Sequence, residues 1–137
     1  MTSGKGRCLC GAVRITAQSV ETRHHACHCR MCRRLVGGPY FAASARGVSF
    51  EGRENITVYQ SSEWAERGFC KVCGSNLFYH LKEPDLYSIA VGIFNKPTQF
   101  VLSGEYFIDN KPDGYDFTGD HPRQTEAEIM AEFTSSD

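Results

Sequence analysis

The sequence predicts a mainly β protein with one or two short helices. In Gly11–Ala17, apolar Val13 and Ile15 alternate with Arg14 and Thr16, which is the period of a half-buried strand. Further short runs are rich in β-branched and aromatic residues and are separated by turns that contain glycine or charged residues. Helical patterns are confined to two short segments, so strands should make up most of the fold.

Five more segments are predicted as strands, in the order in which they occur. The run 86–94 (LYSIAVGIF) is the most apolar of them, which favours a central place in the sheet. An Arg-Gly pair at 46–47 predicts a turn between the first two segments. The five segments are 40–44, 47–52, 55–61, 75–81 and 86–94.

Two short helices are predicted. The first covers 30–36 and ends at Gly37-Gly38-Pro39, which can supply a left-handed cap followed by a stop. The second covers 125–133, with Thr125 as N-cap and Glu128 completing a capping box. The segment 110–122 is a turn-rich arm between them. We find no internal repeat or linker, so we predict one domain over 1–137, with a core of about 6–116 and a C-terminal arm and helix over 117–137.

The composition and net charge of the chain make some classes of function less favoured than others. The 137 residues include 15 basic and 16 acidic side chains, for a net charge of −1, which does not favour nucleic acid or a membrane surface as a partner. The first residues contain no apolar signal-peptide core, and no apolar run approaches the roughly 20 residues that span a bilayer. We therefore expect a cytoplasmic protein. Its oligomeric state is not predicted.

Seven cysteines form three groups: Cys8 and Cys10; Cys27, Cys29 and Cys32; Cys70 and Cys73. In a reducing compartment, clustered thiols more often bind metal or do chemistry than form disulfides. The odd number argues against a full disulfide framework, and buried free thiols would be scattered rather than clustered. The strongest motif is FCKVCGS, a C-x-x-C followed by a glycine that allows a tight turn around a metal thiolate.

Seven cysteines divide naturally into a closed site with four ligands and an open site with three. Spacing alone leaves open whether Cys8 and Cys10, or Cys27 and Cys29, join the C-x-x-C pair. Either arrangement closes a long loop, and structural zinc in finger peptides binds with roughly 10–16 kcal/mol, so the metal should contribute much of the stability. Iron accepts the same four ligands as zinc, so both metals remain open for the closed site.

The segments GRCLCGAVRI, CHCRMCRRLVG, VYQSS and RGFCKVCGSNLFY, in this order, resemble the glutathione-dependent formaldehyde-activating enzyme family, also called the CENP-V/GFA domain. The resemblance runs from Gly6 to about Asp116. It implies an Mss4-like, zinc-bound β fold with two zinc sites. By this resemblance Cys8, Cys10, Cys70 and Cys73 hold a structural zinc, and Cys27, Cys29 and Cys32 hold a catalytic zinc with an open position. The sequence departs from the family late in the chain. The family often has a His-aromatic segment and then a Trp after a Lys-Pro turn, and this chain has Glu105 and Tyr115 near those two places.

The chemistry of three thiolates agrees with the reaction that the resemblance implies. Such a centre is a weak Lewis acid and suits a soft fourth ligand, namely the thiolate of a small-molecule substrate. The family's reaction is of the carbon–sulfur lyase type in the synthetic direction: the sulfur of glutathione adds to formaldehyde, or a related small aldehyde, as in S-(hydroxymethyl)glutathione synthase. The expected partners are therefore a small thiol and a small aldehyde.

Several residues around this segment have more than one interpretation. Arg30, Arg33 and Arg34 could clamp the carboxylates of glutathione, or neutralise an anionic zinc site, or be solvated. His28 lies between two predicted ligands and, in an extended segment, points away from the metal. His24 and His25 are expected at the surface of a strand or loop.

Two other functions are compatible with the cysteines. A non-catalytic zinc-binding interaction module would need only the closed site and has no use for three further cysteines. A redox sensor would form disulfides among Cys27, Cys29 and Cys32 when zinc leaves, and would release metal reversibly with peroxide.

Overall fold

The computed structural model describes residues 2–135, and the side chains of residues 2–132. The chain forms two compact units: unit 1 comprises residues up to 24 and 42–101, and unit 2 comprises residues 25–41 and from 102 onward. The mainly β class predicted from the sequence is confirmed, with two α-helices beside the strands. The prediction of a single domain stays a prediction.

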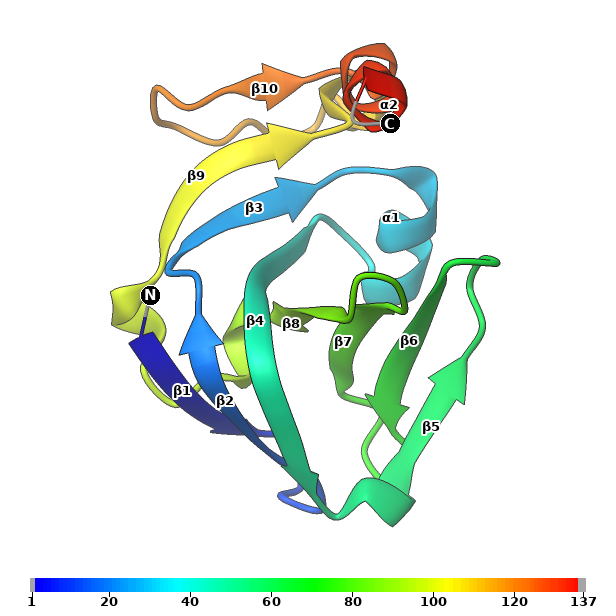
Figure 1. Ribbon diagram of the computed structural model, residues 1–137. Coiled ribbons are helices and arrows are strands. Elements are labelled where there is room, and N and C mark those ends of the chain that lie inside the picture. The colour runs from blue at the N-terminus through cyan, green and yellow to red at the C-terminus, as the bar shows by residue number, and fades with distance from the viewer. Residues whose placement is uncertain (1, 136–137) are drawn as a thin grey trace. The chain divides into compact units, whose positions relative to one another are not determined.

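Unit 1 is an antiparallel sheet (Figure 1). Its strand order is β1–β2–β4–β8–β7–β6–β5, so β8 lies centrally, as the apolar sequence of 86–90 predicts. The strands are β1 (Thr2–Arg7), β2 (Arg14–Val20), β4 (Tyr40–Glu51), β5 (Ile56–Tyr59), β6 (Ala65–Cys70), β7 (Asn76–Leu81) and β8 (Leu86–Ala90). Three 3₁₀ turns accompany them, at Arg53–Asn55, Val91–Ile93 and Pro97–Gln99.

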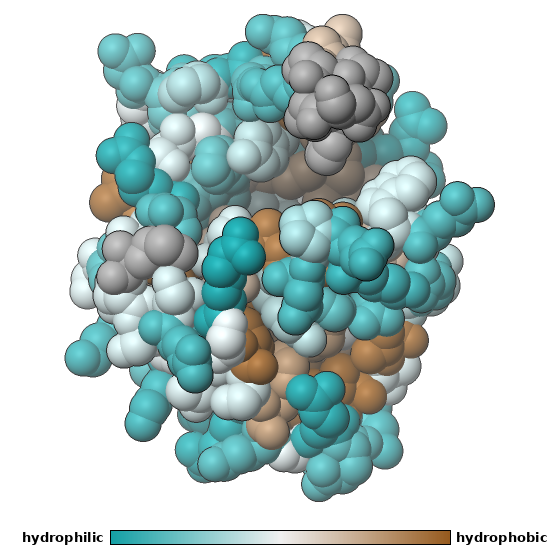
Figure 2. All heavy atoms as spheres, in the orientation of Figure 1, coloured by the Kyte–Doolittle hydropathy of each residue, from teal (hydrophilic) through white to brown (hydrophobic). Residues whose placement is uncertain are grey.

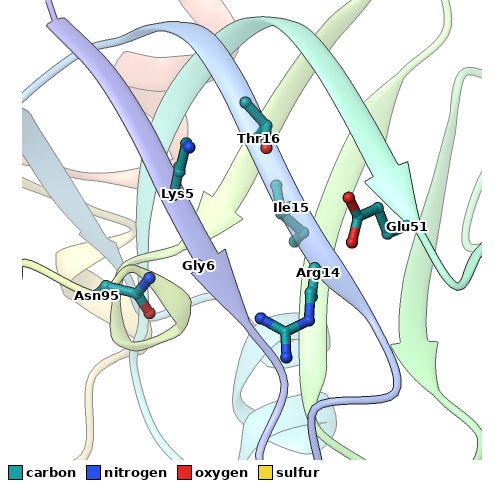
Figure 3. Close-up of a pocket in the computed structure, with 7 residues that line it drawn as sticks. All are labelled: Lys5, Gly6, Arg14, Ile15, Thr16, Glu51 and Asn95. Carbon is teal, nitrogen blue, oxygen red and sulfur yellow. The ribbon is translucent and has the colours of Figure 1, made fainter.

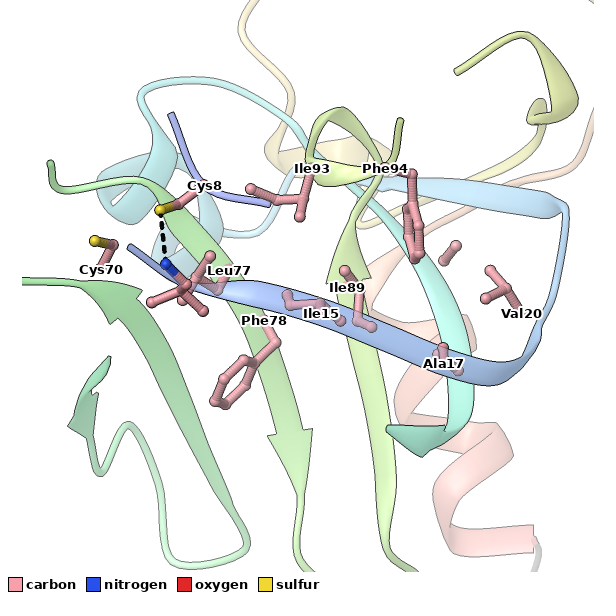
Figure 4. Packing of buried hydrophobic residues seen from close by; sticks show 13 residues of the cluster. Cys8, Ile15, Ala17, Val20, Cys70, Leu77, Phe78, Ile89, Ile93 and Phe94 are labelled. Carbon is pink, nitrogen blue, oxygen red and sulfur yellow. Dashed lines mark hydrogen bonds between the residues drawn. The ribbon is translucent and has the colours of Figure 1, made fainter. Parts of the chain in front are cut away.

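The core of unit 1 packs between these strands and includes two of its cysteines (Figure 4). Ile15, Leu77 and Ile89 are fully buried and supply the bulk of the apolar contact. Cys8 and Cys70 lie at one end of the same cluster, where the backbone amide of Val13 donates to Cys8 Sγ at 3.3 Å. The four-cysteine group therefore continues the hydrophobic core instead of standing apart from it.

Unit 2 contains α1 (Arg30–Val36), α2 (Glu126–Ser135) and most of the strands β3 (Arg23–Cys27) and β9 (Val101–Tyr106). Strand β9 lies between β3 and the short parallel strand β10 (Arg123–Gln124), as the neighbouring blue and yellow arrows of Figure 1 show. A 3₁₀ turn at Ile108–Asn110 follows β9. Along β3, buried side chains alternate with side chains that are exposed or half-exposed.

Both predicted helices form where their capping signals lie. Helix α1 covers 30–36 as predicted and ends at Gly37, which has a φ of 82°. At α2 the Thr125 hydroxyl accepts from the Glu128 amide at 3.2 Å, and the Glu128 carboxylate accepts from the Thr125 amide at 3.0 Å. This is the predicted capping box.

Two strand predictions need correction. Residues 40–44 and 47–52 were expected to be two strands, but β4 runs continuously through Gly47. Gly47 adopts a φ of 63° opposite Gln18, and an added Cβ would lie 2.6 Å from Gln18 Oε1. The glycine therefore accommodates a local change of backbone within the strand, and no turn forms. The predicted strand 86–94 ends at Ala90 and continues as a 3₁₀ turn.

One face of the described part of the chain is mostly polar (Figure 2), and a hollow lies in unit 1. Polar side chains cover most of the face in Figure 2, with small hydrophobic patches between them. A hollow of about 190 Å³ in unit 1 is lined by residues of β1 and β2, among them Lys5, Arg14 and Thr16, and by Asn95 and Glu51 (Figure 3). None of its lining residues is a cysteine. Within the described part of the chain, no helix is long and apolar enough to cross a membrane.

Candidate metal centres

The first candidate centre brings together Cys8, Cys10, Cys70 and Cys73, whose sulfurs all lie within 4.8 Å of one another. Cys8 and Cys10 come from the loop between β1 and β2. Cys70 ends β6, and Cys73 lies in the loop that leads to β7. The Cys8–Cys10 and Cys10–Cys70 sulfur distances are 3.7 and 3.8 Å. A tetrahedral zinc with bonds of about 2.3 Å separates its sulfurs by about 3.8 Å, so this donor set fits such an ion.

The loop backbones of this group point hydrogen-bond donors at the sulfurs. The amide of Ala12 donates to Cys10 Sγ at 3.4 Å. Gly74 takes a φ of 80° and donates its amide to the Cys70 carbonyl at 2.7 Å, which closes the predicted turn. The Ser75 hydroxyl lies 3.2 Å from Cys73 Sγ and, with the Cys10 backbone, lowers the pKa of Cys73 to about 5. The contacts of Cys73 favour a thiolate, which is the form that binds metal. At Cys10 the Ala12 amide lowers the pKa, but burial and the neighbouring cysteines outweigh it and raise the pKa to about 11.

The second candidate centre lies in unit 2, where the sulfurs of Cys27, Cys29 and Cys32 lie within 4.8 Å of one another. Cys27 ends β3, Cys29 is the N-cap of α1, and Cys32 lies in the first turn of that helix. The Cys29 sulfur accepts the amide hydrogen of Cys32 at 3.3 Å. Three sulfurs are thus gathered within six residues because a strand end and a helix start meet there.

Because the three thiols lie close together, the pKa values of Cys27 and Cys29 differ. Hydrogen bonds from the thiols of Cys27 and Cys32, and then from backbone amides, hold the pKa of Cys29 far below its ordinary value. Hydrogen bonds to Cys29 and Cys32, followed by burial, raise the pKa of Cys27. Cys29 therefore ionises more readily than Cys27. Cys27 and Cys29 are half-buried, while Cys32 is 3% exposed.

Behind the cysteines lies a buried charged cluster centred on Glu105, which is 1% exposed. Its Oε1 accepts from His28 Nε2 at 2.7 Å. Its Oε2 accepts from His121 Nε2 at 2.6 Å and from Arg123 Nε at 2.9 Å. Burial opposes ionisation of this carboxyl, but the hydrogen bonds from His121 and His28 outweigh it and lower the pKa of Glu105.

His28 connects this cluster to the cysteine segment. Its side chain is fully buried, as expected for a residue that points away from the sulfurs of its two neighbours. Its Nδ1 lies 3.3 Å from the Tyr115 hydroxyl, and its ring stacks with Phe117 at 6.0 Å. Since Nε2 donates to Glu105, the tautomer leaves Nδ1 as the acceptor for the tyrosine hydroxyl.

The three predicted arginines differ in their surroundings. Arg30 and Arg34 are exposed. Arg33 is half-buried and donates from Nε to the His28 carbonyl at 3.3 Å. This contact ties the first turn of α1 to the strand end, so Arg33 has a structural contact that the other two do not show.

The predicted surface positions of the histidines were right for only one of them. His25 is half-exposed and stacks on Tyr106, with ring centroids 4.5 Å apart. His24 is 8% exposed and contacts Phe100 edge-on at 6.3 Å, so its expected surface position is wrong. The alternation along β3 explains this, since His24, Ala26 and His28 share the buried side.

The comparison with protein families is decisive. The model of the glutathione-dependent formaldehyde-activating enzyme family matches residues 3–110. The chain belongs to this family. The match covers all seven cysteines, so both candidate centres are placed within the region that the family model describes.

Individual relatives of this family member agree. An uncharacterized lyase of Schizosaccharomyces pombe is 34% identical over 132 residues, which cover 95% of this chain and 96% of the relative. A protein of Halomonas elongata named "Putative glutathione-dependent formaldehyde-activating enzyme" is 29% identical over 125 residues, covering 80% and 77%. A crystal structure of a Rhodobacter sphaeroides protein matches with a TM-score of 0.58 and 28% identity, covering 88% of this chain and 99% of that one.

The sequence did not point to the full Glu105 cluster. Its members are spread from His28 to Arg123, and no local spacing connects them. One available signal was the glutamate in an otherwise apolar and small-residue segment, VLSGEYF. A charged residue at a strand position that should be buried indicates a partner of opposite charge.

Proposed function

We propose that the protein is a lyase of this family that joins a small thiol to a small aldehyde, with glutathione and formaldehyde as the first pair to test. The observation that carries the proposal is the second candidate centre: three sulfurs within 4.8 Å, of which two belong to half-buried residues. A tetrahedral metal takes four ligands. The fourth position is then available to the sulfur of a substrate.

In this proposal both groups hold zinc. Cys8, Cys10, Cys70 and Cys73 hold a structural ion, and Cys27, Cys29 and Cys32 hold the catalytic ion. When bound, the catalytic zinc supplies a cation that keeps a thiol substrate deprotonated at neutral pH. The names of the relatives, a lyase and a glutathione-dependent formaldehyde-activating enzyme, support the reaction class and the substrates.

The chain's own residues have distinct roles in this proposal. The three cysteines fix the position from which a substrate sulfur reacts, which converts an encounter of two small molecules into a reaction of oriented groups. The exposed Arg30 and Arg34 bind the carboxylates of glutathione, for which guanidinium groups are suited. Arg33 has the same charge, and its contact with the His28 carbonyl orients the start of α1.

Cobalt substitution tests the proposal directly. Cobalt(II) bound by thiolates has a charge-transfer band and d–d bands that depend on its ligands, so glutathione can be titrated while both are recorded. We expect a saturable change in the wild-type protein that is absent in Cys32→Ser. The four-cysteine group gives a constant background in both proteins and reports on folding. A formaldehyde assay then measures formation of the hydroxymethyl thioether.

The alternatives predict different results. No spectral change with glutathione, together with no catalysis, would contradict the enzyme and favour an interaction module. Reversible release of metal by peroxide, with no thiol binding, would instead favour a redox sensor.

A further inference from the structure

Strands β3 and β9 of unit 2 are neighbours, and their side chains divide into two sets. On β3, His24 and Ala26 are buried, whereas His25 and Cys27 are half-exposed; His28, the residue after the strand, is buried. Successive side chains of a strand point to opposite faces. His25 and Cys27 therefore share one face, and His28, with its Glu105 contact, lies on the other.

Tyr106 of β9 lies on the same face as Cys27. An added Cβ at Gly104 would lie 2.6 Å from His25 Cδ2, so the His25 ring lies against the backbone of Gly104. The same ring stacks on Tyr106, with centroids 4.5 Å apart and planes 9° apart. Gly104 and Tyr106 are two residues apart, as a shared face requires. The cysteine and the phenol are therefore presented on one half-exposed face.

One further contact fixes the backbone of Tyr106 beside the cysteine segment. Its carbonyl accepts from the His28 amide at 3.0 Å, so its backbone is bonded to the residue between Cys27 and Cys29. A tyrosine hydroxyl, with an ordinary pKa of about 10, is protonated at neutral pH and can donate a hydrogen bond.

We propose that Tyr106 is a catalytic residue whose hydroxyl donates a hydrogen bond to the aldehyde oxygen while a thiolate sulfur held at Cys27, Cys29 and Cys32 adds to the carbonyl carbon. This inference rests on the proposed function of the three-cysteine centre. It explains how negative charge that develops on the aldehyde oxygen is stabilised in a site whose other groups are anionic sulfurs.

The step balances without a further reactant. The thiol loses its proton to solvent water when its sulfur binds as a thiolate. A carbon–sulfur bond forms, and the electron pair of the carbon–oxygen π bond moves to oxygen. Tyr106 gives its proton to that oxygen and regains one from water. The sum is one thiol plus one aldehyde giving one hydroxymethyl thioether, with no oxidation or reduction.

The substitution Tyr106→Phe tests this role because it removes only the hydroxyl and keeps a ring to stack on His25. Thiols also add to formaldehyde without a catalyst, so the measured quantity is the enzyme-dependent rate after subtraction of that background. Loss of one donor to a developing oxyanion lowers kcat by roughly 10²–10³-fold, and we expect a fall of this order. In the cobalt protein, glutathione should still bind with an affinity within about twofold of wild type.

Tyr115→Phe is the matched control. It removes the same atom from unit 2, but that hydroxyl contacts His28 Nδ1 on the opposite face of β3. We expect its rate to stay within about twofold of wild type. The cobalt bands of the four-cysteine group report for every variant whether the chain is folded.

The outcomes separate the two proposals. If Tyr106→Phe is folded, binds glutathione and reacts at the wild-type rate, the role of Tyr106 is overturned while the proposed function stands. If Tyr106→Phe loses glutathione binding as well, the hydroxyl serves binding or packing, and its catalytic role is likewise overturned. If the wild-type protein neither binds thiol at cobalt nor catalyses the addition, the proposed function fails first.

Discussion

The substitution Glu105→Gln should destabilise the protein strongly although it changes only one atom. Both oxygens of Glu105 accept hydrogen bonds from N–H donors, namely His28 on one side and His121 and Arg123 on the other. A glutamine has one oxygen and one NH₂ group, so one of the two acceptors is lost, and the NH₂ faces either the Arg123 guanidinium or His28, whose Nε2 then cannot donate. It also removes the negative charge beside the Arg123 guanidinium.

The expected loss follows from the burial of this cluster. Leaving a buried donor without its acceptor costs about 1–3 kcal/mol, and more where a charged group is involved, and Glu105 and His28 are 1% and 0% exposed. We therefore expect a fall of about 3 kcal/mol in the free energy of unfolding, since glutamine keeps one acceptor. With a urea m-value of about 2 kcal/mol/M for a small protein, the midpoint should fall by about 1.5 M.

The assay is urea unfolding followed by circular dichroism, at one fixed free zinc concentration because bound metal adds to the apparent stability. Glu66→Gln is the control: its carboxylate contacts His80 Nδ1 at 3.0 Å but is 26% exposed. Pairs near the surface contribute about 0–1 kcal/mol. The reasoning is refuted if Glu105→Gln shifts the midpoint no more than Glu66→Gln does.

Three further predictions concern the cysteine groups, acid stability and the last helix. Cys70→Ser should abolish cooperative thermal unfolding, because it removes a buried ligand and core residue at once, whereas Cys32→Ser should still unfold cooperatively; equal effects in calorimetry would contradict separate roles. Because the pKa of the Glu105 carboxyl is lowered in the folded protein, its ionised form contributes fully to stability above pH 4.5, the ordinary pKa of the group. This contribution is lost as the pH falls from 4.5 toward the lowered pKa. Below pH 4.5 wild type should therefore lose stability more steeply than Glu105→Gln, and parallel curves would argue against this source. Thr125→Ala removes the hydroxyl that caps α2, which should cost about 1 kcal/mol and speed amide hydrogen exchange in the first turn of α2, with unchanged exchange as the contrary result.

Features that depend on neighbours in sequence were predicted well. Helix α1 begins and ends at the predicted residues because its stop is the local Gly-Gly-Pro signal at 37–39. The capping box of Thr125 and Glu128 spans three residues and forms as expected. The two cysteine groups also agree with the resemblance, since their spacing is a strong signal and the family order assigns the pairs.

Features that depend on distant contacts were missed. Strand β1 has the sequence TSGKGR, with glycines where a strand pattern needs apolar residues. An added Cβ at Gly6 would lie 2.3 Å from the Ile93 carbonyl oxygen, so a segment more than 80 residues away requires the glycine. Strands β6 and β9 were not predicted either, because AERGFC and VLSGEY have little alternation. These two strands form because they pair with neighbouring strands, although their own sequences carry little strand signal.

The alternation of β3 lets one short strand serve stability and chemistry together. Its half-exposed face presents His25 and Cys27. The next residue, His28, is held by Glu105 at 2.7 Å on the buried face and cannot turn without breaking that contact. In the proposed metal site, rigidity of this kind would hold the sulfurs close to a tetrahedron. The buried charged cluster of Glu105 costs desolvation energy, and through His28 it contacts the segment that carries the three cysteines.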